Sequence, residues 1–138
     1  MLTVVSEAIR PHLHGIMSME TPEPLEVWQP SDTEVFGVRV IAFIGPKPEG
    51  PADRFDVVVC SPRWLAGSGQ TASTDAVVGG EPMWLMRQWS YPDVLAYVQA
   101  ACDEISPQSS WPAAALMLAP WLDWEFAPEY RRGLRQVG

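Results

Sequence analysis

The chain of 138 residues has little cysteine, little histidine and no long apolar run, and these shortages exclude several classes of protein. Its two cysteines, Cys60 and Cys102, are too few for a disulfide framework. No segment approaches the roughly 18 consecutive apolar residues that cross a bilayer. The first ten residues lack the basic and apolar parts of a secretory signal. We therefore expect a cytoplasmic protein that does not enter a membrane.

Positive charge is also scarce, because nine Lys and Arg residues face 17 Asp and Glu residues and the net charge is −8. Three of the nine cations (Arg131, Arg132 and Arg135) lie in a basic tail, residues 131–138. The rest of the chain is strongly acidic, so it would repel nucleic acid and attract a cationic partner. An acidic composition that serves only solubility is the plainer alternative. The apolar fraction of 47% excludes a disordered chain.

The hydrophobic pattern predicts four strands followed by two helices. The strands are expected at residues 11–17, 35–44, 55–60 and 83–88. The second segment is apolar on both faces, so we place it in the centre of the sheet or under helices. Ser90 and Ser110 each precede a proline and an apolar helical stripe, which is typical of helix starts. The order predicts an α+β fold, a small antiparallel sheet of about four strands with C-terminal helices packed on one face.

The length fits one domain that spans residues 1–138. Residues 1–10 are expected to form an N-terminal extension. Residues 67–80 are rich in glycine, serine and threonine, and we expect a flexible loop there.

No motif in the chain predicts catalysis, so we assign no catalytic residue, no metal ligand and no cofactor. His12 and His14 alternate along the first predicted strand and would share a face. With carboxylates they would suit a small metal-dependent hydrolase, which we keep as an alternative function. Two half-exposed histidines without a metal are the plainer interpretation. Cys60 and Cys102 fall at apolar positions and are expected in the core.

Two long stretches of the chain contain acids and no cation, and the second ends in aromatic residues. Aromatic side chains anchor protein interfaces, and carboxylates steer and pair with Arg or Lys. We therefore predict a partner-binding set formed by Glu20, Glu23, Glu26, Asp32, Glu34, Asp123, Trp124, Glu125, Glu129 and Tyr130. The alternative is that the rings of Trp121, Trp124 and Phe126 fill the core while the acids only face water.

Four short motifs occur in a particular order between residues 11 and 130: Ile44-Gly45-Pro46-Lys47, Asp53-x-Phe55, Val59-Cys60-x-Pro62-x-Trp64-Leu65 and Trp124-Glu125-Phe126. In this order they resemble the immunity protein 8 family of bacterial polymorphic toxin systems. The resemblance implies an antitoxin without enzymatic activity. It would bind and neutralise a cognate toxin domain with a basic contact surface, and so protect the producing cell.

The sequence leaves other functions open. A structural module that oligomerises would bury residues 121–130 between copies of the chain, and the oligomeric state is not predicted. An acidic surface that imitates nucleic acid would still make an inhibitor. The shared motifs are expected to support the fold, because a toxin-specific surface needs positions that vary.

Overall fold

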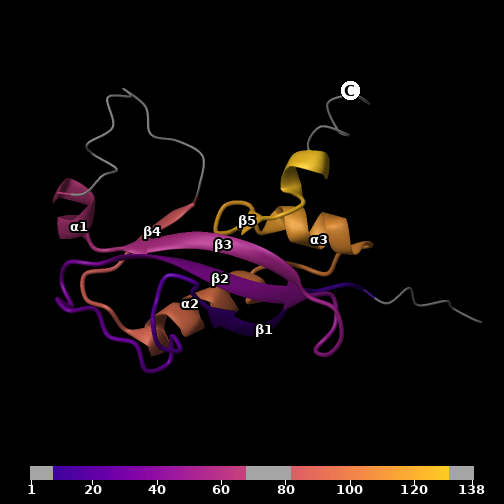
Figure 1. Cartoon of the computed structure of the whole chain (residues 1–138). Coiled ribbons are helices and arrows are strands. Elements are labelled where there is room, and N and C mark those ends of the chain that lie inside the picture. The colour runs from indigo at the N-terminus through magenta and orange to yellow at the C-terminus, as the bar shows by residue number, and fades with distance from the viewer. Residues whose placement is uncertain (1–7, 68–81, 131–138) are drawn as a thin grey trace, which may run out of the picture.

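The computed structural model describes residues 8–67 and 82–130 of the chain, and it confirms the predicted α+β class. Five strands form one sheet; three of them come first, the fourth follows the first helix, and the fifth follows the third helix (Figure 1). The strands are β1 (His12–Met17), β2 (Gly37–Gly45), β3 (Asp53–Cys60), β4 (Met83–Leu85) and β5 (Asp123–Trp124). The helices are α1 (Pro62–Gly67), α2 (Tyr91–Asp103) and α3 (Trp111–Met117), and residues 127–130 form a last helical turn.

The sheet has the order β1-β2-β3-β4, and β5 also pairs with β3. β5 lies beside Phe55 and Asp56, whereas β4 lies beside the last three residues of β3. The pairs β1–β2, β2–β3 and β3–β5 are antiparallel, whereas β4 runs parallel to β3. The sequence interpretation differed in two details, since it expected only antiparallel pairs and no strand at β5. β5 has only two residues, which is too short to show the alternation of apolar and polar residues by which a strand is recognised. The direction of β4 depends on the path of the chain between β3 and β4, which the strand's own sequence does not reveal.

One face of the sheet carries the hydrophobic core. Alternate residues of β2 and β3, such as Val40, Ile44, Phe55 and Val57, point to this face and are fully buried. All four buried residues of α2 and Ala115 of α3 belong to the same core cluster, so both helices cover this face, as predicted. β2 lies between β1 and β3, as predicted, and Ile41 on its opposite face is also buried.

Both predicted helix starts are confirmed. The Ser90 hydroxyl accepts a hydrogen bond from the backbone N–H of Asp93 at 3.4 Å, and Ser110 accepts one from Ala113 at 3.2 Å. Each serine satisfies a backbone donor that the helix itself leaves unpaired. No helix in the two described ranges is long and apolar enough to cross a bilayer.

Helix α1 was not predicted, and it lies over the face of the sheet opposite the core. The Ser61 hydroxyl accepts hydrogen bonds from the backbone N–H groups of Phe36 and Trp64, so it joins α1 to the start of β2. The Trp64 indole then covers Gly37, where any side chain would collide with the ring. Trp64 and Leu65 are half-buried, and no residue of α1 is fully buried. Of the predicted extension, loop and tail, residues 1–7, 68–80 and 131–138 lie outside the described residues.

Candidate functional site

The first group of predicted binding residues lies in the connection between β1 and β2, residues 18–36, which we call the acidic loop. Four of its five acids are exposed, and Glu34 is half-buried. Glu34 pairs with Arg63 at 3.0 Å, and Glu20 accepts the backbone N–H of Arg39. The carboxylate of Glu23 makes no hydrogen bond or ion pair within the described part of the chain. The loop therefore presents negative charge that the fold neutralises only in part.

The acidic loop is fixed against the segment that leads into α2. Its Leu25 side chain is buried in the core, and its Trp28 ring packs edge-on against Trp89 with centroids 5.0 Å apart. Burial raises the pKa of Tyr91, and the charge and a side-chain hydrogen bond of Glu26 raise it further. These contacts hold the acids beside the beginning of α2.

The second group lies in residues 121–130, which we call the C-terminal segment. Trp124 is only 3% exposed, so its ring belongs to the core and offers almost no surface to a partner. Tyr130 stacks on this ring with centroids 5.1 Å apart and is 42% exposed. Phe126 packs edge-to-face against Trp124 with centroids 5.8 Å apart and is 40% exposed. The exposed aromatic surface is thus Tyr130 with Phe126, and the prediction did not include Phe126.

The acids of the C-terminal segment lie beside a charged network on β3. The Glu125 carboxylate accepts the backbone N–H of Arg54 at 3.0 Å. The Arg54 guanidinium donates two hydrogen bonds to Asp56, at 2.8 and 3.0 Å, and the Asp56 interaction raises the pKa of Arg54. Asp56 stands opposite Asp123 in the β3–β5 pairing. Sequence reasoning missed Arg54 and Asp56, because their alternation on β3 carries meaning only once β5 is paired beside it.

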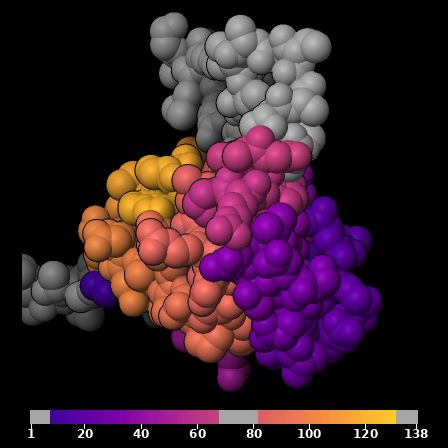
Figure 2. Space-filling model, turned by 90° about the vertical axis from the view of Figure 1, so that its left-hand side faces the viewer, coloured from indigo at the N-terminus to yellow at the C-terminus, as the bar shows by residue number. Residues whose placement is uncertain are grey.

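The two acidic groups border the same segment of the chain. The acidic loop contacts Trp89 and Tyr91, as described above, while the Trp84 indole N–H donates to the backbone oxygen of Trp121 at 3.1 Å. Figure 2 shows one face of the molecule on which the region of β4 and α2, in salmon and orange, lies between the purple acidic loop and the gold C-terminal segment. The fold therefore places both groups around one face, separated by β4 and α2.

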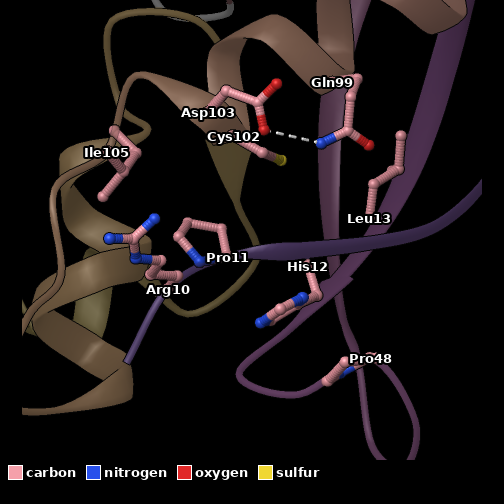
Figure 3. Close-up of a pocket in the computed structure, with 9 residues that line it drawn as sticks. All are labelled: Arg10, Pro11, His12, Leu13, Pro48, Gln99, Cys102, Asp103 and Ile105. Carbon is pink, nitrogen blue, oxygen red and sulfur yellow. Dashed lines mark hydrogen bonds between the residues drawn. The ribbon is translucent and has the colours of Figure 1, made fainter. Parts of the chain in front are cut away.

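A separate hollow of about 460 Å³ lies between the start of β1 and the end of α2 (Figure 3). His12, Cys102 and Asp103 all line it, and these residue types occur in cysteine hydrolases. However, burial raises the pKa of the Cys102 thiol to about 12, whereas a nucleophilic cysteine needs a lowered pKa. The Asp103 carboxylate accepts a hydrogen bond from Gln99 at 3.0 Å. Burial therefore keeps the Cys102 thiol of this hollow protonated.

In the alternative metal-dependent hydrolase, His12 and His14 would be metal ligands, and within the described residues the structure brings no further ligands to them. A register irregularity falls between Leu13 and Gly15, and His14 Nε2 donates to the backbone oxygen of Lys47 at 2.8 Å. Over residues 8–67 and 82–130, no three His, Cys, Asp or Glu side chains gather as a metal site would require.

The motifs that carry the family resemblance meet one another inside the fold. Phe55 stacks on Trp124 with centroids 6.3 Å apart, and the backbones of Arg54 and Glu125 pair beside them. A side chain at Gly45 would come within 2.3 Å of the Pro51 backbone oxygen, so glycine is required at this close approach. These motif positions support the fold, as expected.

Comparison with known proteins agrees with this picture. No curated protein and no solved structure matches the chain. The model of one protein family, described as Immunity protein 8, matches residues 12–129, which is nearly the whole chain. The chain therefore belongs to the Immunity protein 8 family.

Proposed function

We propose that this protein is the antitoxin of one cognate bacterial toxin domain, which it binds stoichiometrically and blocks without catalysis inside the producing cell. The observation that carries the proposal is the family match over residues 12–129, because the family is one of immunity proteins. The partner is then a toxin domain, encoded in the simplest case by a neighbouring gene.

The charge of the chain supports a cationic contact surface on the toxin. The chain carries a net charge of −8, and six of the ten acids that are exposed in residues 8–67 and 82–130 lie in the acidic loop or in the C-terminal segment. Such a surface speeds the encounter with a cationic protein and disfavours partners of the same sign. The predicted binding set remains our proposal, with Tyr130 and Phe126 rather than Trp124 as its aromatic contacts.

The test is co-expression of the toxin domain encoded next to this gene, with and without this chain. We expect growth to be restored only when the chain is present, and a one-to-one complex to be recovered on purification. The association rate should fall as the salt concentration rises, because salt screens the charges that steer the encounter. Cells that die equally fast with and without the chain, and the absence of a complex, would refute the proposal.

A further inference from the structure

A groove of about 400 Å³ opens between β4 and α2. Its walls are largely apolar and come from β4 and the residues after it, including Met83, Leu85 and Met86, and from α2 through Val94 and Tyr97. Leu85 and Tyr97 are 60% and 53% exposed. An exposed apolar groove of this kind, with a carboxylate in its lining, is a feature of interfaces rather than of free surfaces.

Two aromatic rings give the groove a rigid wall. Trp84 and Tyr97 pack edge-to-face with centroids 4.6 Å apart. The hydrogen bond from the Trp84 indole to the Trp121 backbone oxygen fixes this ring in place. Tyr97 therefore presents a ring to solvent whose position is already set, so a partner would lose little entropy in ordering it.

One carboxylate lies at the groove, and it is available. Asp93 lines the groove from the first turn of α2. Its backbone N–H is bonded to Ser90, but within the described residues its carboxylate has no hydrogen bond and no ion pair. Helix α2 contains no Lys or Arg, and Arg87, the nearest cation in sequence, does not line the groove. The charge at the groove is negative and would attract a cationic group of a partner.

We propose that this groove receives an arginine side chain of the toxin. The aliphatic stem would lie along Met83 and Leu85, and the guanidinium would rest on the Tyr97 ring and pair with Asp93. Arginine suits both the aromatic ring and the carboxylate, because its planar cation stacks on aromatic rings and forms charge-assisted hydrogen bonds with carboxylates. The inference rests on the proposed antitoxin function and names the anchor at the centre of its interface.

The place of the groove agrees with this role. Its walls belong to β4 and α2, the region that lies between the acidic loop and the C-terminal segment in Figure 2. Anchoring residues tend to occupy the centre of an interface while a polar rim excludes water. A second copy of this chain is a poorer occupant, since it would bring two strongly acidic surfaces together.

The experiment compares variants of the full chain in their affinity for the neighbouring toxin domain by titration calorimetry. Asp93→Asn and Tyr97→Ala should each weaken binding roughly tenfold or more, whereas Tyr97→Phe, which keeps the ring, should bind almost as the wild type does. Asp103→Asn is the matched control, because Asp103 lies on the same helix but lines the other hollow. Thermal unfolding of each variant shows whether the fold is retained.

A second arm identifies the occupant. Each exposed arginine of the toxin is replaced by Gln, and each variant is titrated with the wild type and with Asp93→Asn. One arginine should show a loss that is not additive with Asp93→Asn, as expected for two groups in contact.

The outcomes separate the two proposals. If the wild type binds the toxin but folded Asp93→Asn and Tyr97→Ala bind equally well, the groove inference is overturned and the antitoxin function stands. A homodimer in solution that Tyr97→Ala dissociates would also overturn it. If the wild type does not bind the toxin, the proposed function is refuted, and so is the groove inference that rests on it.

Discussion

Asp53 accepts a hydrogen bond of 3.0 Å from the indole N–H of Trp124, a residue 71 positions further along the chain. The same carboxylate oxygen accepts a second bond, of 2.7 Å, from the Trp111 indole. One oxygen thus ties the start of β3 to α3 and to β5. Asp53 and Trp124 belong to two of the motifs on which the family resemblance rests, and this hydrogen bond shows that both residues support the fold.

Replacement of Asp53 by Ala should destabilise the protein, because it leaves two indole N–H groups without their acceptor. Each orphaned donor costs about 1–3 kcal/mol, so we expect a loss of at least about 2 kcal/mol in the free energy of unfolding. Denaturant unfolding followed by near-ultraviolet circular dichroism measures it. Glu23→Ala, which removes an exposed carboxylate without a partner among the described residues, should change the free energy of unfolding little. Equal stability of the two variants would contradict this role for Asp53.

Gly45→Ala should be costly and Gly15→Ala should not. A Cβ at Gly45 would lie 2.3 Å from the Pro51 backbone oxygen, whereas a Cβ at Gly15 would meet nothing within 4 Å. The backbone must shift to accept the first change, which we expect to cost about 1–3 kcal/mol of stability. Melting temperatures of the two variants test the difference. A Gly45→Ala protein as stable as Gly15→Ala would show that the backbone moves away from the new Cβ without any loss of stability.

The buried thiol of Cys102 should make the protein less stable in alkali. Burial, with a smaller contribution from the charge of Asp103, raises the pKa of Cys102 from 9.0 to about 12. Above pH 9 the unfolded chain loses this proton while the folded chain keeps it, so stability is lost as the pH rises from 9 towards 12. The slope from this group is about 1.4 kcal/mol per pH unit.

Denaturant unfolding between pH 8 and pH 11 measures this slope for the wild type and for Cys102→Ala. The variant should lose less stability per pH unit than the wild type, even if it is less stable at every pH. Parallel pH dependences of the two proteins would show that Cys102 ionises equally in the folded and unfolded states.

Neutral variants of two exposed acids should slow association with the toxin. Glu23 lies in the acidic loop and Glu129 in the C-terminal segment, and both side chains are exposed. The double variant Glu23→Gln, Glu129→Gln should associate a few-fold more slowly at low salt, and the difference should shrink at high salt. Stopped-flow mixing measures the rates. Its stability should stay within about 0.5 kcal/mol of the wild type, and an unchanged rate would show that these acids do not steer the encounter.

Local patterns were enough to predict the serine caps of α2 and α3 and the central position of β2. A cap depends on residues three positions apart, and a strand that is buried on both faces is recognised by apolar residues at successive positions. The same holds for the net charge and for the acids of the loop, since their exposure follows from their chemistry.

Other features depended on which segments meet. Trp124 looks like an interface anchor in the sequence, yet the pairing of β5 with β3 turns its ring into the core and leaves Tyr130 and Phe126 outside. The direction of β4 and the groove beside Tyr97 follow in the same way from contacts between distant parts of the chain.

The sequence by itself determined the fold class, the helix starts, the acidity and the family of this protein, because each of these depends on composition or on residues close together in the chain. Only the tertiary structure decided which aromatic rings are buried and which acids border one face. Side-chain burial is set by the long-range pairing of strands and helices, and no local pattern encodes that pairing.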